Sequence, residues 1–248
     1  MVYITMSTVA IVTGGSGAIG RAIASRLAST GRQVVITGRS MDKLQAAADQ
    51  LQSAAAGGRI IPIACDVTDE QSVEGMFAAV ANDHGPCSLL VNSAGIMKGG
   101  PTETLSAQVF SEVLSVNVVG PFICAREAFK QMMQHGGGRI INIGSIASES
   151  PRPDSAPYTT SKFAISGLTR SLALDGRQHN IAVGAIHPGN VLSDLLSADE
   201  IARREQTEGF ITADDVAACV MTMVDLPASA SVLELSVIPT KQPLVGRG

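Results

Sequence analysis

The sequence has few charged residues, and its lysines and arginines form no cluster. Charged side chains make up 16% of the 248 residues, whereas about 25% is usual. The formal net charge is −4. We therefore expect no nucleic acid among the partners of this protein. A chain with so little charge is expected to hide part of its surface against copies of itself, which favours a homotetramer or a homodimer.

Cysteine is also scarce, and the spacing of the cysteines does not indicate a metal site. The chain has Cys65, Cys87, Cys124 and Cys219, with no CxxC pair, which is typical of reduced, structural cysteine in a cytoplasmic protein. Hydrophobic residues reach 45%, but the longest unbroken apolar run is far short of the ~20 residues that cross a bilayer. The first residues lack the basic region and the cleavage site of a signal peptide. We expect a cytoplasmic protein with no membrane partner and no metal.

Short apolar segments alternate with amphipathic segments along the whole chain. We expect strands at residues 8–13, 33–37, 59–64, 88–91, 139–143, 181–186 and 231–237. We expect helices at residues 21–30, 42–56, 69–83, 158–176 and 213–225. Residues 104–134 are expected to form one helix or two, with Pro121 at a kink or in a first turn. This alternation predicts one α/β domain over residues 1–248, a doubly wound Rossmann fold with a mostly parallel seven-stranded sheet.

A glycine-rich turn follows the first expected strand and opens the first expected helix. The segment is Thr13-Gly14-Gly15-Ser16-Gly17-Ala18-Ile19-Gly20. Glycines let the backbone turn tightly and approach a pyrophosphate, which then lies at the positive end of the helix. The alternative is a strand–helix turn that is rich in glycine by chance, but the strand–turn–helix context favours dinucleotide binding.

The end of the second strand indicates which dinucleotide is bound. An acidic residue at this place would bind the ribose 2′-hydroxyl of NAD, whereas an arginine accommodates the 2′-phosphate of NADP. The acid is missing, and Arg39 and Ser40 follow the strand, so we expect NADP(H), unless Arg39 is only a solvated loop residue. After the third strand, Asp66 and Val67 are candidates for contact with the adenine, although Asp66 could instead cap the next helix.

Tyr158 follows Ser145 by thirteen residues, and Lys162 follows Tyr158 by four residues, which is about one helical turn. At this spacing both side chains leave the same face of a helix. A lysine ammonium beside a phenol favours the phenolate and lowers the pKa of the tyrosine. Such a phenol exchanges a proton with a substrate oxygen, and a serine hydroxyl hydrogen-bonds that oxygen. The pattern is short, so a surface helix carrying the same residues by chance is the competing interpretation.

Taken together, these segments resemble the short-chain dehydrogenase/reductase family over nearly the whole chain. The glycine-rich turn matches the family's TGxxx[AG]xG motif, and Asn92-Ser93-Ala94-Gly95 matches its NNAG motif with Ser93 in place of the second Asn. Pro188-Gly189 match its PG motif. Asn117, Ser145, Tyr158 and Lys162 fall on its catalytic tetrad in order and spacing. Without the family, Asn117 is also open to a structural role in an apolar helix.

The resemblance implies a cofactor half at about residues 1–140, a catalytic half at about 141–248 and a small lid at about 190–212. It implies that the cofactor contacts Gly14, Ser16, Gly17, Ala18, Ile19, Gly20, Arg39, Ser40, Asp66, Val67, Asn92, Ala94, Gly95, Tyr158, Lys162, Pro188, Gly189, Val191 and Ser193. It also implies that Lys162 binds the nicotinamide ribose and that Asn117 holds a water molecule linking Lys162 to solvent.

The function implied by the resemblance is NADP(H)-dependent interconversion of a carbonyl compound and an alcohol by hydride transfer, with Tyr158 as acid and base. The alternatives are an NAD-preferring alcohol or hydroxy-acid dehydrogenase that acts oxidatively, and a non-catalytic dinucleotide-binding sensor. The substrate is a small molecule. Apolar residues expected at the cleft favour hydrophobic substituents: Met97, Ile146, Ala147, Leu192 and Leu195. Polar groups are expected to meet Glu149, Arg152 or Asp154.

Overall fold

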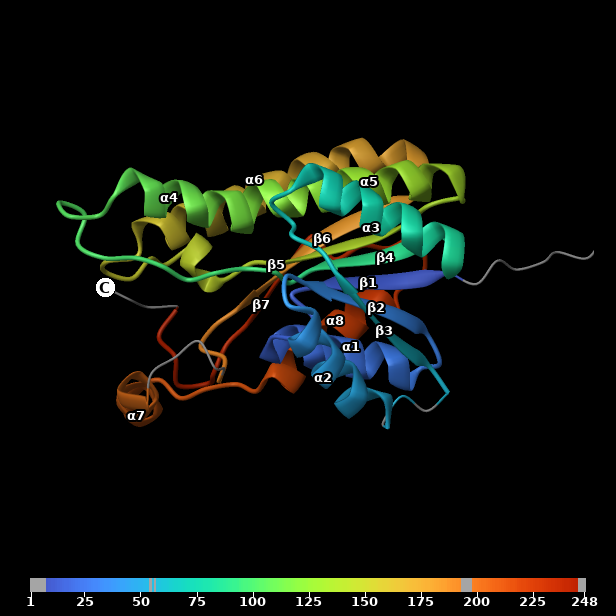
Figure 1. Cartoon of the computed structure of the whole chain (residues 1–248). Helices are drawn as coiled ribbons and strands as arrows, with labels where there is room; N and C mark the ends of the chain where they lie inside the picture. The colour runs from blue at the N-terminus through green and yellow to red at the C-terminus, as the bar shows by residue number, and fades with distance from the viewer. Residues whose placement is uncertain (1–7, 54, 56, 193–197, 245–248) are drawn as a thin grey trace, which may run out of the picture.

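The computed structural model describes residues 8–53, 55, 57–192 and 198–244. Seven strands form one sheet in the order β3-β2-β1-β4-β5-β6-β7 (Figure 1). Every neighbouring pair is parallel, so the predicted Rossmann fold is confirmed and the sheet is wholly parallel. The strands are β1 Val9–Thr13, β2 Gln33–Gly38, β3 Arg59–Ala64, β4 Cys87–Asn92, β5 Gly138–Ile143, β6 Ile181–Pro188 and β7 Glu234–Val237.

The strand sequences suit their positions in this sheet. β1 lies inside the sheet, between β2 and β4, and is buried along its whole length, as its unbroken VAIVT run predicts for a strand covered on both faces. β3 contains Pro62 and lies at one edge of the sheet. Because proline has no amide hydrogen to donate to a ladder, an edge is where it is tolerated.

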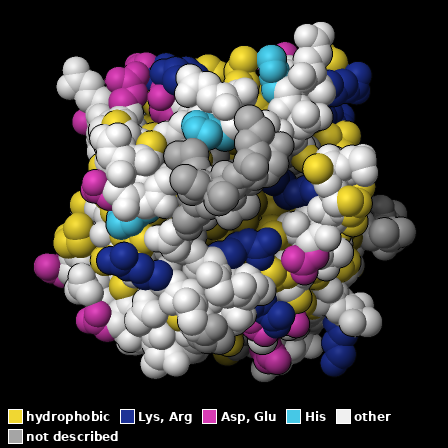
Figure 2. All heavy atoms as spheres, turned by 90° about the vertical axis from the view of Figure 1, so that its right-hand side faces the viewer, with side chains coloured by type: hydrophobic (Ala, Val, Ile, Leu, Met, Phe, Trp, Pro, Cys, Tyr) yellow, Lys and Arg dark blue, Asp and Glu magenta, His cyan; other side chains and the backbone are white. Residues whose placement is uncertain are grey.

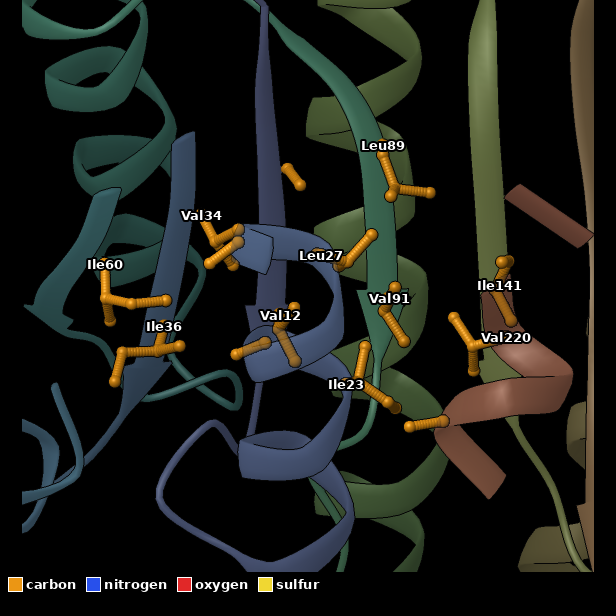
Figure 3. Packing of buried hydrophobic residues seen from close by; sticks show 14 of the residues in the cluster. Val12, Ile23, Leu27, Val34, Ile36, Ile60, Leu89, Val91, Ile141 and Val220 are labelled. Atoms are coloured by element: carbon orange, nitrogen blue, oxygen red, sulfur yellow. The ribbon is translucent and has the colours of Figure 1, made fainter. Parts of the chain in front are cut away.

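Helices cover both faces of the sheet, which places the core in two layers (Figure 1). Residues of α1, α2 and α8 pack on one face, where Ile23, Leu27 and Val220 meet strand residues such as Val12 and Val91 (Figure 3). Residues of α3, α5 and α6 pack on the other face. The helices are α1 Ala18–Ser29, α2 Met41–Gln52, α3 Glu70–Asp83, α4 Ala107–Leu114, α5 Gly120–Gln134, α6 Ala156–Gly176, α7 Ala198–Thr207 and α8 Ala213–Val224.

The helical stretch expected at residues 104–134 forms two helices, α4 and α5. α4 and α5 are joined by a π-helical turn, Ser115–Val119, and Pro121 lies in the first turn of α5. A proline is tolerated there because the amide at that position is not needed for a helical bond. The expected helix at 42–56 ends earlier, at Gln52, and the expected strand at 231–237 begins later, at Glu234.

By length and composition, one stretch of the described residues, Ala107–Gln134, is apolar enough to cross a membrane, and 33% of its 18-residue window is buried. The expectation from unbroken apolar runs missed this stretch because polar residues interrupt it. In the structure, α5 packs against β4 and the stretch lies beside α6 on one face of the sheet (Figure 1). Its buried side therefore belongs to the core.

The strand order reverses between β1 and β4, and a crevice forms where the carboxyl ends of these two strands separate. α7, inside the expected lid, lies near this end of the sheet, on the left in Figure 1. Figure 2 shows the opposite face, at the amino ends of the strands, where basic and acidic side chains are interspersed with apolar ones. The sites that follow all lie at the carboxyl end.

Candidate active site

The glycine-rich turn is a cradle that has no room for side chains. A Cβ on Gly20 would lie 2.3 Å from the carbonyl oxygen of Gly14, and Gly14 itself has a φ of +66°. Gly17 precedes α1 and provides no side-chain cap for its first amide groups. These N–H groups are thus available to an anion at the positive end of the helix. The turn fits a pyrophosphate, so the residues present fit a dinucleotide.

A cavity of about 320 Å³ extends from this turn to the ends of β2 and β3. Most of the predicted cofactor residues line it, namely Gly14, Ser16, Gly17, Ala18, Ile19, Gly20, Arg39, Asp66, Val67, Ala94 and Gly95. The floor is held by Thr13, whose Oγ1 accepts hydrogen bonds from the amides of Ser93 and Ala94, both at 3.0 Å. Because only the backbone of Ser93 takes part, the serine that departs from the NNAG motif leaves this contact intact.

Asp66 lies at the expected place but does not cap the following helix. Its Oδ1 accepts from the amide and the hydroxyl of Thr68, at 3.0 and 2.8 Å, whereas Asp69 caps α3. The amide of Thr68, and to a lesser extent its hydroxyl and the charge of Arg39, lower the pKa of Asp66. The carboxylate is thus ionised at neutral pH and lies near Arg39 at the rim of the cavity.

Ser40 and Asn92 use their side chains in the fold. The Oγ of Ser40 accepts from the amide of Lys43 and so caps α2, which leaves the hydroxyl hydrogen for another partner. Asn92 is 3% exposed, and its Nδ2 donates to Asn142 and to the carbonyl of Pro121. Parallel strands β4 and β5 place the two asparagines side by side, and Asn92 does not line the dinucleotide cavity. Its contact with the cofactor stays a prediction.

Ser145, Tyr158 and Lys162 line a second cavity of about 220 Å³. Ser145 follows β5, and its Oγ accepts from the amide of Ala147 at 3.1 Å, which leaves the hydroxyl hydrogen to donate elsewhere. Tyr158 and Lys162 come from one face of α6, and the Nζ of Lys162 lies 5.4 Å from the centre of the phenol ring. The predicted spacing thus brings all three side chains to one place.

The electrostatics of this cluster differ from the expectation that Lys162 lowers the pKa of Tyr158. Burial raises the pKa of Tyr158, and the hydroxyl of Ser145 acts in the opposite direction. Burial also lowers the pKa of Lys162 from 10.5 to about 8. The Nζ of Lys162 donates to the carbonyl of Ile143 at 2.9 Å. In the protein without cofactor, desolvation therefore outweighs attraction between the ammonium and the phenolate.

Asn117 lies in the π-helical turn, and its carboxamide bonds three groups of the chain. Its Oδ1 accepts from the amide of Ile96, and its Nδ2 donates to the carbonyl of Ile96 and to the Oγ of Ser161. Ser161 in turn donates to the carbonyl of Tyr158 at 2.7 Å. The side chain thus fixes the segment after β4 to α6, which is a structural role. Its predicted role in holding a water molecule near Lys162 stays a prediction. Ser161 was missed, since a serine inside a helix gives no signal by itself.

A sequence profile described as short chain dehydrogenase matches residues 8–203, which is more than half of the chain. The chain belongs to this family.

Curated and solved relatives agree with the fold and with an oxidoreductase activity of this short-chain dehydrogenase. The gluconate 5-dehydrogenase of Gluconobacter oxydans is 36% identical over 194 residues, which cover 77% of this chain and 75% of the relative. An actinorhodin polyketide ketoreductase variant solved with NADPH is 29% identical, with a TM-score of 0.87 over 94% of this chain and 96% of the other. A metagenomic short-chain oxidoreductase solved with NADP is 33% identical, with a TM-score of 0.80 over 94% and 97% of the two chains. The protein is an oxidoreductase.

In this short-chain dehydrogenase, His187 holds the loop after β5 against the end of β6. Its ring is 2% exposed, and Nδ1 lies 3.2 Å from both the carbonyl oxygen of Ser145 and the Oγ of Ser148. A Cβ on Gly144 would lie 2.5 Å from this ring nitrogen. From the sequence alone, His187 is equally well explained as a packed histidine or as a substrate contact. The contacts that identify it as packed are with Ser145 and Ser148, 42 and 39 residues away in the chain.

The wall of the catalytic cavity contains both expected and unexpected residues. Met97, Ile146, Ala147 and Arg152 line it as expected. Pro188, Gly189 and Val191 line it too, and their contact with the cofactor stays a prediction. Leu192 is 49% exposed, and neither it nor Glu149 nor Asp154 lines the cavity. Ser193 and Leu195 lie outside the described residues. Asn190, Arg204 and Gln242 also line the cavity, and Gln242 was missed because it belongs to a tail expected to be irregular.

Proposed function

We propose that this short-chain dehydrogenase uses NADP(H) to interconvert a ketone or aldehyde and the corresponding alcohol. The observation that carries the proposal is the junction of the two cavities. Ser145, Tyr158 and Lys162 line one cavity, and the other is lined by the glycine-rich turn. Both cavities share Ile19, Ser93, Gly95 and Ile96. A dinucleotide lying over the turn therefore has its reactive end beside the tyrosine.

In the reducing direction the chemistry needs a hydride for the carbonyl carbon and a proton for its oxygen. When bound, NADPH supplies the hydride. Ser145 donates a hydrogen bond to the carbonyl oxygen, where negative charge develops, and Tyr158 gives its phenolic proton to the same oxygen. The raised pKa of Tyr158 keeps the phenol protonated at neutral pH, which suits an acid. Lys162 stabilises the phenolate that results and binds the ribose of the nicotinamide.

The preference for NADP over NAD rests on Arg39. This residue follows β2 and lines the dinucleotide cavity, at the place where an acid would otherwise bind the ribose. A Cβ built on Gly38 would lie 3.8 Å from Leu44 and 4.0 Å from Ser16, at ordinary contact distance. Two solved relatives hold NADPH or NADP, which supports the same assignment.

The proposal is tested by Tyr158→Phe. We expect kcat to fall by at least about a hundredfold, because the substrate oxygen loses its proton donor and one hydrogen bond. The measurement is NADPH oxidation at 340 nm across ketones, ketoesters, quinones and steroids, with NADPH binding followed by fluorescence. Tyr3→Phe, at the only other tyrosine of the sequence, is the control and should retain turnover. Near-normal turnover by Tyr158→Phe would refute the mechanism.

A further inference from the structure

The catalytic cavity has an unusual balance of charge. Three cationic side chains line it, Lys162 beside the tyrosine and the two arginines Arg152 and Arg204, whereas none of the described lining residues is Asp or Glu. The whole chain has the opposite excess, with 22 acidic and 18 basic residues. The excess of cationic over acidic side chains is therefore a property of this cavity and not of the overall composition.

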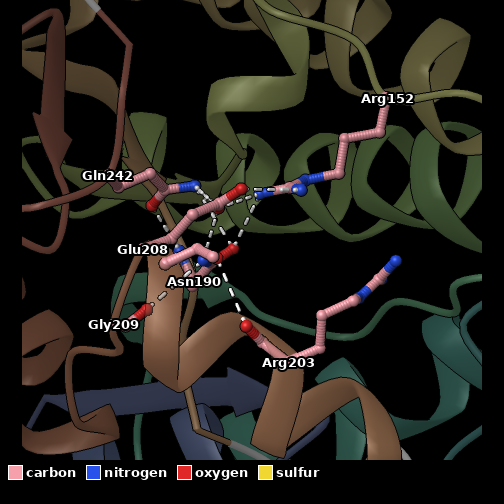
Figure 4. A network of polar contacts seen from close by, with 7 residues as sticks. Arg152, Asn190, Arg203, Glu208, Gly209 and Gln242 are labelled. Atoms are coloured by element: carbon pink, nitrogen blue, oxygen red, sulfur yellow. Dashed lines mark hydrogen bonds and ion pairs between the residues drawn. The ribbon is translucent and has the colours of Figure 1, made fainter.

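Arg152 is held in place by a network of residues that are far apart in the sequence (Figure 4). Its guanidinium bonds both carboxylate oxygens of Glu208 and the Oδ1 of Asn190, the last at 3.1 Å. Gln242 donates to the same Oδ1 at 3.2 Å and accepts from the amide of Asn190 at 2.8 Å. Asn190 and Gln242 are 6% and 4% exposed. The guanidinium is therefore fixed before a ligand arrives, which reduces the entropy lost on binding.

The network does not use all of Arg152. Its bonds to the described residues occupy three of the five N–H groups of the guanidinium. The side chain is 34% exposed, against 15% for Glu208, and Arg152 lines the cavity whereas Glu208 does not. Glu208 thus supports the arginine from behind and leaves part of its surface to the cavity.

We propose that the substrate carries a carboxylate separated from the reacting carbonyl, and that Arg152 and Arg204 bind this carboxylate. The inference rests on the proposed function and names its substrate class, a keto acid or the matching hydroxy acid. The planar guanidinium matches a carboxylate in geometry and charge. Ile96, Met97 and Ile146 in the same cavity accommodate the hydrocarbon part.

The test compares matched substrates. Keto acids with one to four carbons between the ketone and the carboxylate are measured beside their methyl esters, with NADPH oxidation at 340 nm as the readout. We expect kcat/KM for the best acid to exceed that of its ester by at least about tenfold in the wild type. We expect Arg152→Gln and Arg204→Gln each to reduce this ratio about threefold or more, mainly through KM of the acid.

Several controls keep the outcome clear. Arg177→Gln changes an exposed arginine after α6, and the acid-to-ester ratio should not change. Arg204→Gln carries the test if Arg152→Gln disrupts the network, and Arg152→Lys, which retains the charge, should keep more of the preference than Arg152→Gln. Esters reduced as well as acids would overturn this inference and leave the proposed function standing. An acid preference that survives both glutamine variants would also overturn it, and turnover of neither acids nor neutral ketones would overturn the proposed function itself.

Discussion

Lys162 is an amine that the fold keeps largely out of water. It is 7% exposed and bonded to the carbonyl of Ile143, and burial lowers its pKa to about 8. A group whose charged form is disfavoured in this way destabilises the folded state while it is charged, and the effect disappears once it is neutral in both states. The residue proposed to take part in the reaction is thus one that lowers the stability of the fold while it is charged.

The pH dependence of that cost can be measured with Lys162→Met. Below pH 8 lysine is charged in both states and the full penalty applies, and above its ordinary pKa of 10.5 the penalty is gone. The stability advantage of the Met variant over the wild type should therefore fall by about 2 kcal/mol between pH 7 and pH 10. Urea unfolding of the cofactor-free proteins at both pH values measures it. An advantage that stays constant with pH would contradict the lowered pKa.

Arg39 should decide the cofactor. In Arg39→Asp the carboxylate repels the 2′-phosphate of NADPH and is placed to accept from the 2′-hydroxyl of NADH. We expect the ratio of kcat/KM for NADPH over NADH to fall by about a hundredfold or more, since a close ion pair becomes a repulsion. Lys43→Asp, on the exposed first turn of α2, makes the same change of charge nearby and should shift the ratio much less. An unchanged ratio in Arg39→Asp would show that another residue reads the phosphate.

At the scale of elements, the site depends on how closely the ends of β5 and β6 approach. The Cβ of an alanine at Gly144 would lie 2.5 Å from the His187 ring, so Gly144→Ala must displace the ring or the Ser145 loop. We expect a loss of about 1–3 kcal/mol of stability, as for other overpacked interiors. Because His187→Ala removes the obstacle, the double variant should lose less than the sum of the two single losses. Strict additivity in urea unfolding would show that the two residues do not meet.

At the scale of the whole molecule, one layer of helices leaves apolar stripes on its outer side. In α5, Phe122 and Met133 are 45% and 50% exposed, and in α6, Phe163 and Leu174 are 51% and 60% exposed. Each pair is separated by three helical turns, so its members share a face. α5 and α6 belong to the same layer (Figure 1). We propose that these stripes meet a second copy of the chain in a homodimer or homotetramer.

The assembly is tested by Phe122→Asp combined with Phe163→Asp. Buried charges without partners would prevent the stripes from packing, so we expect monomers by light scattering at micromolar concentration, with the secondary structure retained. Glu103→Lys, at an exposed position before α4, should leave the assembly unchanged. A wild-type monomer under the same conditions would contradict the proposal.

The sequence by itself determined the elements and most of the candidate site. Parallel strands buried on both faces must be apolar throughout, so β1 and its neighbours stand out. The glycine-rich turn, Ser145 and the Tyr158–Lys162 pair were predictable because each depends on a local conformation or on one helical turn. The fold is confirmed, whereas a cytoplasmic location and the roles of individual residues stay predictions.

Only the tertiary structure decided which distant segments meet. The Arg152–Glu208–Asn190–Gln242 network joins three loops and the tail, and the contact of His187 with Gly144 joins two strands. No local pattern marks such contacts, because they depend on where separate elements end in space. The effect of burial on the pKa of a side chain also depends on which distant segments meet around it. The raised pKa of Tyr158 follows from everything that surrounds the ring, whereas the sequence shows only its neighbour Lys162, whose charge acts in the opposite direction.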